Sequence, residues 1–235
     1  MKLGIITGGS RGLGAALFEE LLRDGYRVVE FSRSAPHPSS VSVDLSQPES
    51  ALAKIATSLK AIPTEDLEAL IVINNAATLA PIGPTSKKPA EQVLANINTN
   101  FASQILAISL IVAHFQRAHC RKVLASISSG AAHKSYFGWS LYCAAKAGME
   151  AYIETLALEQ QREQSPFIPI NIDPNVIDTE MQSLIRNTSS SDFPDVERFQ
   201  RRKSEGKLCT PELVAHQVLR IIGRADVTPG GRYEV

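Results

Sequence analysis

The chain has 235 residues, of which 44% are hydrophobic and 20% are charged. That length suits one large α/β domain, and the composition excludes a disordered chain. The 24 basic and 24 acidic side chains give a formal net charge of zero, which argues against a strongly basic surface for nucleic acid. We therefore expect a single folded domain over residues 1–235 with no nucleic-acid partner.

Cysteine usage and the apolar segments indicate the compartment. Three cysteines without a C-x-x-C spacing argue against a disulfide framework or a structural zinc site, and they favour a reducing environment. The N-terminal sequence MKLGIITGG lacks the apolar core of a secretory signal. The most apolar stretch, Ile105–Phe115, is interrupted by Ser109 and His114 and is shorter than a bilayer span. We expect a soluble, cytoplasmic protein with no metal and no membrane partner.

Short apolar runs alternate with longer helical patterns along the chain. Strands are predicted at Leu3–Thr7, Arg27–Phe31, Val41–Val43, Leu70–Asn74, Lys122–Ile127, Phe167–Ile172 and near Tyr233. Helices are predicted at Gly12–Arg23, about Ala90–Ala118, about Leu141–Gln161 and Pro211–Ile222. Strands that alternate with crossover helices form a parallel sheet covered on both faces, so we expect a doubly wound, Rossmann-like α/β fold of three layers.

One long segment near the C-terminus has no clear pattern. Thr179–Lys207 is rich in Ser, Asp and Arg, and it contains Pro194. A long, weakly patterned insertion directly after a strand end is more often a binding lid than a defect in the fold. We expect this segment to be a substrate lid.

The first predicted strand runs into a glycine-rich turn, TGGSRGLG at residues 7–14. Its glycines allow a tight turn and a close approach of the backbone to a pyrophosphate, which would lie on the N-terminus of the next helix. Glycines also make ordinary turns, but a cluster between a strand and a helix at the start of an α/β chain predicts a dinucleotide site. The turn residues expected to bind the cofactor are Gly8, Ser10, Arg11, Gly12, Leu13 and Gly14.

The end of the second strand indicates which dinucleotide binds. An acidic residue there would bond the ribose 2′-hydroxyl of NAD, whereas an arginine accommodates the 2′-phosphate of NADP. The strand ends in Ser32 and Arg33, and Arg11 in the glycine turn is a second cation. Both arginines could instead be solvated surface charges, and Glu30 would face the ribose if the strand were shifted in register. We predict NADP(H) as the cofactor.

A tyrosine and a lysine four residues apart, Tyr142 and Lys146, lie on one face of a predicted helix. An ammonium beside a phenol favours the phenolate and lowers the pKa of the tyrosine towards a useful acid–base range. Ser129 lies upstream at the end of the strand Lys122–Ile127, and the carboxyl ends of parallel strands are where α/β sheets hold their ligands. These three residues therefore form a candidate acid–base site.

The motifs occur in the order of a known family. They are TGGSRGLG, INNAA (Ile73–Ala77), Asn100, ISS (Ile127–Ser129), YCAAK and PNVIDT (Pro174–Thr179). Over essentially its whole length the chain resembles the short-chain dehydrogenase/reductase family. Within that family it is similar to reductases of benzil-like diketones and to reductases of pterin side chains. The resemblance implies an NADP-dependent oxidoreductase that acts on C=O or CH–OH groups of a small molecule.

The resemblance also implies a role for each residue that matches the family pattern. Tyr142 would donate a proton to the carbonyl oxygen, Lys146 would tune Tyr142 and hold the nicotinamide ribose, and Ser129 would polarise the carbonyl. Asn100 would complete a proton relay through water. Further cofactor contacts are implied for Asp44, Leu45, Asn75, Ala76, Pro174, Ile177 and Thr179.

Two residues depart from the family pattern. Ala77 replaces the glycine of N-N-A-G, a change that we expect only to tighten packing. Asn175 replaces the glycine of P-G. Asparagine tolerates left-handed backbone better than most residues, so we expect the turn to survive.

Aromatic residues between Ser129 and Tyr142 indicate a substrate pocket. Tyr136, Phe137 and Trp139 could be ordinary core, yet a cluster on the loop between two catalytic residues is expected to line the pocket, with Met181 on another wall. Together with the resemblance, this lining favours NADPH-dependent reduction of a bulky ketone, one carbonyl of a benzil-like vicinal diketone.

Two alternatives remain open. A pterin side-chain reductase would need a polar or acidic anchor for the ring, for which Glu234 is the C-terminal candidate. A non-catalytic NADP sensor belongs to another class, and it would have no need of an intact Ser129, Tyr142 and Lys146.

The assembly is also suggested by the apolar helices. The helix Phe101–Ala113 is hydrophobic on most sides, and such a helix must be buried on most sides. With the helix after Tyr142 it forms the pair through which the resembled family assembles. We expect a homodimer or homotetramer.

Overall fold

The computed structural model describes the whole chain, residues 1–235. Its centre is one seven-stranded sheet with the order β3-β2-β1-β4-β5-β6-β7, in which every pair of neighbours is parallel. The strands are β1 (Lys2–Thr7), β2 (Arg27–Ser32), β3 (Ser40–Ser42), β4 (Ala69–Asn74), β5 (Arg121–Ile127), β6 (Phe167–Asp173) and β7 (Arg232–Glu234). The predicted doubly wound, Rossmann-like fold is confirmed.

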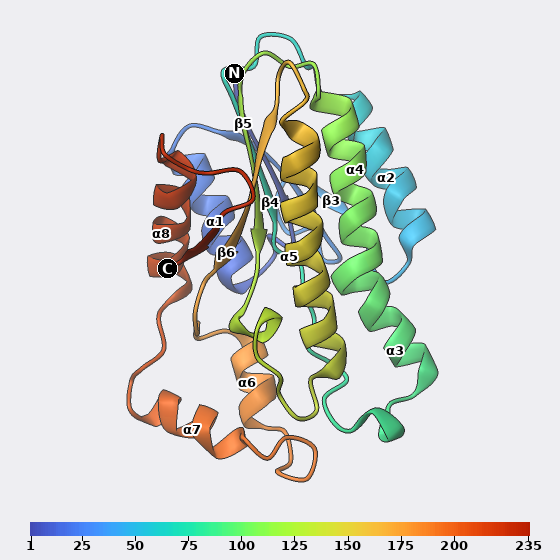
Figure 1. Cartoon of the computed structure of the whole chain (residues 1–235), viewed down its shortest axis with the longest axis vertical. Helices are drawn as coiled ribbons and strands as arrows, with labels where there is room; N and C mark the ends of the chain where they lie inside the picture. Colours follow the sequence, from blue (N-terminus) through green and yellow to red (C-terminus); the bar gives the residue numbers. More distant parts are fainter.

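Helices cover both faces of the sheet, as Figure 1 shows. One face carries α1 (Gly12–Arg23) and α8 (Pro211–Gly223), and the other carries α2 (Pro48–Lys60), α4 (Ser103–Phe115) and α5 (Ser140–Gln160). The shorter helical elements are η1 (Thr85–Lys87), α3 (Ala90–Ile97), the π-helix η2 (Asn98–Ala102), η3 (Gly130–Ala132), α6 (Glu180–Arg186) and α7 (Val196–Ser204). The result is the expected three-layer arrangement.

Each face of the sheet has its own hydrophobic core. Side chains of a strand alternate between the two faces. In β1, Leu3 and Ile5 join the core under α2, α4 and α5, whereas Ile6 joins the core under α1 and α8. Burial on both faces explains why the strands are nearly continuous apolar runs rather than alternating ones.

The strand order reverses between β1 and β4, which are neighbours although β1 is followed in the chain by β2. The loops that leave β1 and β4 therefore diverge to opposite sides and open a crevice at the carboxyl edge of the sheet. The glycine-rich turn follows β1 at this edge, and Asn75 follows β4. Figure 1 shows α6 and α7 at the same end of the molecule.

The structure corrects several predicted elements. The helix α2 was missed, because its buried residues Ala51, Ile55 and Leu59 make only a narrow stripe with one apolar side chain per turn. The single helix expected over Ala90–Ala118 is three consecutive elements, α3, η2 and α4, and it ends at Phe115. A π-helical turn is not visible in a hydrophobic pattern, but such turns are frequent at functional sites.

The weakly patterned segment Thr179–Lys207 is more regular than its sequence suggests. It contains α6 and α7. Its buried apolar side chains, Ile185, Phe193, Val196 and Phe199, are few and lie among polar and charged residues, so the segment shows no sustained helical period.

One helical run has the length and apolar composition of a membrane span, Ala90–Phe115, which joins α3, η2 and α4. It is longer than the stretch Ile105–Phe115 considered from the sequence. In this fold Ala107, Ile108 and Ile111 lie in the core against the sheet. The run is therefore accounted for as a helix of the three-layer domain.

Candidate active site

The glycine-rich turn lies at the crevice and is shaped by its missing side chains. Gly8 and Gly12 have positive φ angles of 71° and 53°, which favour glycine. A Cβ on Gly8 would lie 2.7 Å from Ala76 Cα, and a Cβ on Gly14 would lie 1.9 Å from Gly8 O. The helix α1 begins here, and Arg11 at its N-cap makes no side-chain capping bond to the helix. The free N–H groups and the tight backbone fit the pyrophosphate of a dinucleotide.

Residues of β1 and β4 hold the turn in place. Asn75 Nδ2 donates to the main-chain oxygens of Thr7 (3.2 Å) and Gly8 (2.9 Å). Thr7 Oγ1 accepts from the main-chain N–H groups of Asn75 (3.1 Å) and Ala76 (3.2 Å). The predicted cofactor residues Gly8, Asn75 and Ala76 are thus brought together, with Asn75 acting on the shape of the turn.

A second support lies beneath the turn and was missed from the sequence. Glu30 is fully buried, and its Oε1 accepts from the N–H of Gly9 at 2.9 Å. His37 stacks on Phe18 with ring centroids 3.7 Å apart, and its Nε2 lies 3.2 Å from Gly9 O. Glu30 is therefore engaged with the turn, and its Oε1 is taken by a main-chain N–H rather than being free for a ribose.

The two predicted phosphate-binding arginines differ in their surroundings. Arg33 is exposed directly after β2, where the structure gives it no ion pair. Arg11 forms an ion pair with Glu180 at the start of α6, and both side chains are exposed. Arg33 is thus a free cation at the strand end, whereas Arg11 links the glycine turn to α6.

The remaining predicted cofactor residues lie around the same edge. Asp44 is exposed, and its Oδ1 accepts from the N–H (2.9 Å) and the hydroxyl (2.8 Å) of Ser46. Thr179 precedes α6, and its Cγ2 lies 3.2 Å from the place of a Cβ on Gly12. Asn175 has φ 57°, so the predicted left-handed turn after β6 is confirmed. Buried side chains at this edge are those of Leu13, Ser32, Leu45, Pro174 and Ile177, and Ser10 is half-buried.

The three residues predicted to form an acid–base site meet at the carboxyl end of β5. Ser129 lies just after β5, and its Oγ accepts from Ala131 N at 3.2 Å. Tyr142 and Lys146 lie on the first turns of α5, and their side chains are 7% and 8% exposed. The Nζ atom of Lys146 lies 5.6 Å from the centroid of the Tyr142 ring. Lys146 Nζ donates to the main-chain oxygen of Ile127. Their proximity is as the sequence predicted.

The charge balance of this site differs from the sequence expectation. Burial raises the pKa of Tyr142 to about 12, although a side-chain hydrogen bond with Ser129 acts to lower it. Burial also lowers the pKa of Lys146 to about 8, although the nearby carboxylates of Asp173 and Glu150 favour its charged form. The lowered tyrosine pKa expected from the lysine is therefore not found, because the loss of water around the phenol outweighs the hydrogen bond with Ser129.

Asn100 lies buried in the π-helix η2. Its side chain exchanges two hydrogen bonds with the main chain of Thr78, at 2.8 Å and 2.7 Å, and donates to Asn96 Oδ1 at 3.0 Å. These bonds hold the loop after β4. A part for Asn100 in a proton relay stays a prediction.

An aromatic cluster covers Tyr142. Trp139 is buried, with its ring centroid 6.1 Å from that of Tyr142 and 4.7 Å from that of Tyr136. Phe193, from the segment between α6 and α7, stacks on Trp139 with centroids 4.9 Å apart and planes at 12°. Phe199 of α7 packs on both rings. The buried Trp139 Nε1 has no hydrogen-bond partner.

The predicted pocket residues divide into two groups. Tyr136, Trp139 and Met181 belong to this cluster, whereas the Phe137 side chain is 56% exposed and lies outside it. Phe193 and Phe199 were not predicted from the sequence. The only signal for them was the pair of aromatic residues in an otherwise polar segment.

A family model described as short chain dehydrogenase matches residues 2–190. The chain belongs to the short chain dehydrogenase family. It is accordingly an oxidoreductase that acts on CH–OH or C=O groups of a small molecule, with a nicotinamide cofactor.

Individual short chain dehydrogenases are similar over the full length. The chain is 33% identical to a "Benzil reductase ((S)-benzoin forming)" of Bacillus subtilis, covering 99% of this chain and 97% of that protein. It is 28% identical to the sepiapterin reductase of Mus musculus, covering 98% and 95%. A solved short chain dehydrogenase of Burkholderia cenocepacia in complex with NADP superposes with a TM-score of 0.78 at 20% identity, covering 100% of this chain and 96% of that one. The structure of the KRED1-Pglu enzyme gives a TM-score of 0.82 at 25% identity, covering 99% and 100%.

Proposed function

We propose that the chain is an NADPH-dependent carbonyl reductase that converts one carbonyl of a bulky vicinal diketone into an alcohol. The observation that carries the proposal is the meeting of Ser129, Tyr142 and Lys146 beneath an aromatic cluster at the carboxyl end of β5. Similarity to the benzil reductases of two Bacillus species supports the diketone as substrate.

The reaction divides between cofactor and protein. The glycine-rich turn would hold the dinucleotide, whose nicotinamide would provide the hydride for the carbonyl carbon. Tyr142 gives its phenolic proton to the carbonyl oxygen, so that the C=O group becomes CH–OH. Ser129 donates a hydrogen bond to the same oxygen and polarises the carbonyl. Lys146, when charged, stabilises the phenolate that remains on Tyr142.

The surroundings of Tyr142 favour an aromatic diketone. Trp139, Tyr136 and Met181 offer flat and apolar surface for an aryl ring. Trp139 Nε1 is a buried donor without a partner, and such a donor has a free-energy cost. A second carbonyl oxygen next to the one being reduced would satisfy it.

The preference for NADPH is supported by the strand end. Arg33 is exposed and unpaired after β2, and Glu30 is engaged with Gly9, so a cation rather than an acid is available to a ribose 2′ group. Arg11 becomes a second phosphate ligand when it leaves Glu180.

We propose that the segment 179–207 is the lid of this site. Phe193 is fully buried against Trp139, and Tyr142 is only 7% exposed, so the segment closes over Tyr142 in this structure. A substrate reaches Tyr142 after Phe193 has moved off Trp139. The single domain 1–235 would work in the cytoplasm, where its three free cysteines stay reduced.

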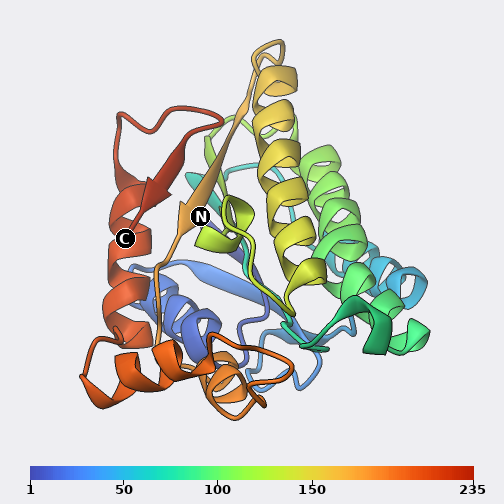
Figure 2. The same cartoon turned by 60° about the horizontal axis from the view of Figure 1, so that its bottom comes forward.

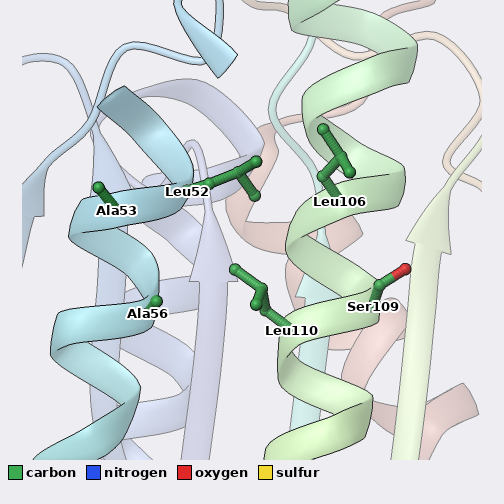
Figure 3. Close-up of a pocket in the computed structure, with 6 residues that line it drawn as sticks. All are labelled: Leu52, Ala53, Ala56, Leu106, Ser109 and Leu110. Carbon is green, nitrogen blue, oxygen red and sulfur yellow. The ribbon is translucent and has the colours of Figure 1, made fainter. Parts of the chain in front are cut away.

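We propose a homodimer or homotetramer joined through α4 and α5. Leu106 of α4 and Leu158 of α5 are 39% and 63% exposed. Figure 3 shows Leu106 and Leu110 beside an apolar groove whose other wall is formed by Leu52 and Ala56 of α2. A second copy would cover these side chains. Light scattering at micromolar concentration should give a dimer or tetramer, and a monomer would contradict the proposal.

A substrate panel tests the function. Purified protein is mixed with benzil, a small aliphatic diketone or sepiapterin, with NADPH or NADH, and cofactor oxidation is followed by absorbance. We expect the highest kcat/KM for benzil with NADPH. Faster turnover of sepiapterin would favour the pterin reductase, which the similarity to sepiapterin reductases keeps as the second candidate. Its acidic anchor would have to be other than Glu234, which is paired with Arg232. Tight NADPH binding without turnover of any carbonyl would favour the sensor.

A further inference from the structure

A buried group of charges lies behind the candidate catalytic lysine. Glu150 and Asp173 are 4% and 6% exposed. Arg232 lies between them: its Nε donates to Glu150 Oε1 at 3.2 Å, and its Nη2 donates to Asp173 Oδ2 at 2.7 Å. We call these three residues the rear charge cluster.

Three elements far apart in the sequence bring the rear charge cluster to Lys146. Glu150 is one helical turn after Lys146 on α5, so the two side chains share a face. Asp173 is the last residue of β6, and its neighbour Ile172 pairs with Ile127 of β5. The carbonyl oxygen of Ile127 accepts a hydrogen bond from Lys146 Nζ. Arg232 begins β7, the last strand, which lies beside β6 in Figure 2.

The three charges of the cluster leave one net negative charge, which a protonated Lys146 balances. Glu150 and Asp173 carry two negative charges, and Arg232 offsets one of them. An uncompensated charge in a buried site has a large desolvation cost. The second positive charge is that of Lys146, which both carboxylates favour electrostatically.

The other polar groups around the cluster are neutral or open to water. Ser128 donates its hydroxyl to Glu150, and His133 Nε2 lies 2.6 Å from Glu150 Oε2. The side chains of His133 and Glu234 are 61% and 63% exposed, so solvent screens them. Among the other elements packed on α5, η2 and η3 have no charged residue, and the one charged residue of α3, Glu91, is exposed. Arg121 and Lys122 of β5 lie at the opposite end of that strand from Ile127.

We propose that Glu150, Asp173 and Arg232 are positioning residues that keep Lys146 charged and thereby set the pH range in which Tyr142 can act as the proton donor. The part that concerns Tyr142 rests on the proposed function. The part that concerns Lys146 does not.

The cluster predicts opposite effects for its acidic and basic members. Since burial already lowers the pKa of Lys146 to about 8, activity should fall as the pH rises through that value. Removing a carboxylate takes away a group that favours the ammonium, so the alkaline limb should move to lower pH. Removing Arg232 takes away a repelling cation, so the limb should move to higher pH. A merely structural role would not give shifts of opposite sign.

The pH dependence of kcat/KM tests the proposal. We expect Glu150→Gln to move the alkaline limb down by about one pH unit, and Arg232→Gln to move it up by about one. The double variant should return towards the parent. Arg232→Lys keeps the cation and should keep the limb in place. The proposal is wrong if Glu150→Gln and Arg232→Gln shift the limb in the same direction, or if neither shifts it.

Arg224→Gln is the matched control. It removes the same charge from an exposed pair with Asp226, away from Lys146, and should leave the profile unchanged. If Arg232→Gln does not fold, Asp173→Asn and Arg232→Lys replace it. The proposal then requires a downward shift for Asp173→Asn and none for Arg232→Lys.

A second measurement separates this proposal from the proposed function. The ¹³Cε signal of Lys146, assigned by its absence in Lys146→Arg, is titrated in protein without substrate. Its midpoint should move down in Glu150→Gln and up in Arg232→Gln, and a fixed midpoint would overturn the role of the cluster. A parent protein that reduces no carbonyl would overturn the function while this titration still decides the cluster.

Discussion

The cofactor half and the substrate half of the candidate site are built in different ways. The glycine-rich turn is shaped by its main chain and by absent side chains, as where Gly14 lies against Gly8 O, and side chains such as Glu30 support it from beneath. The substrate half is defined mainly by side chains, with Phe193 stacked on Trp139 above Tyr142. A turn made of backbone accepts almost no substitution, whereas a cluster of side chains can be repacked. We therefore expect the first half to determine the cofactor class and the second half to determine the substrate.

The largest expected effect is at Tyr142, where the two halves meet. Tyr142→Phe keeps the ring that packs on Trp139 and loses only the transferable proton. Turnover should fall by about 10²–10⁴, because that is the usual contribution of a general acid. NADPH binding, followed by fluorescence, should stay close to the parent value. A variant that keeps most of the diketone reduction would defeat the catalytic assignment.

Gly14→Ala tests the backbone half. Its Cβ would lie 1.9 Å from Gly8 O, so the turn must open and lose its fit to a pyrophosphate. The Kd for NADPH should rise about 100-fold, the equivalent of two lost hydrogen bonds to a charged group. Gly223→Ala is the control, since that helical glycine has nothing within 4 Å of the added atom. Unchanged NADPH affinity in Gly14→Ala would show that the turn does not hold the cofactor.

Arg33→Asp tests which dinucleotide the backbone half accepts. Replacing the exposed cation after β2 by an acid should lower the NADPH-to-NADH affinity ratio by about tenfold or more. Arg27→Asp makes the same charge change at the other end of β2 and should leave the ratio unchanged. Tighter binding of NADH than of NADPH by the parent would contradict the NADP assignment directly.

Gly138→Ala tests the side-chain half with a smaller effect. Gly138 has φ 81°, and its Cβ would lie 2.3 Å from Asp192 O in the lid. The lid should open, and kcat should fall by less than about tenfold, since only packing around Tyr142 is lost. Trp139 is the one tryptophan of the chain, so its emission should shift to longer wavelength.

Gly206→Ala is the matched control for this change. Gly206 has φ 65° and carries the same backbone strain on substitution, but it has no neighbour within 4 Å of the added atom. Its Trp139 emission should equal that of the parent. An equal spectral shift in both variants would mean that strain, and not the lid contact, is the cause.

The sequence predicted the features that depend on local patterns. The parallel sheet follows from apolar runs that alternate with helical periods, and the left-handed turn at Asn175 follows from the residue type. The meeting of Ser129, Tyr142 and Lys146 follows from a strand end and an i, i+4 spacing.

The features that were missed depend on pairing between distant segments. The local sequence around Phe193 gives no sign that this side chain stacks on Trp139 in the folded chain. The ion pair of Arg232 with Asp173 forms only because β7 lies beside β6 in the sheet. A local hydrophobic pattern does not predict such contacts between distant segments. The direction of the Tyr142 pKa was also wrong, because spacing places Lys146 beside it but does not reveal how completely water is excluded.

The proposed lid would also determine how ligand affinities compare with one another. In that mechanism a substrate reaches Tyr142 only after Phe193 has left Trp139, so the apparent Kd would equal the intrinsic Kd divided by the fraction of molecules that are open. All substrates share that fraction. The ratio of two apparent Kd values therefore depends on the pocket alone, and a variant that opens the lid tightens every ligand by the same factor while the ranking of substrates stays the same.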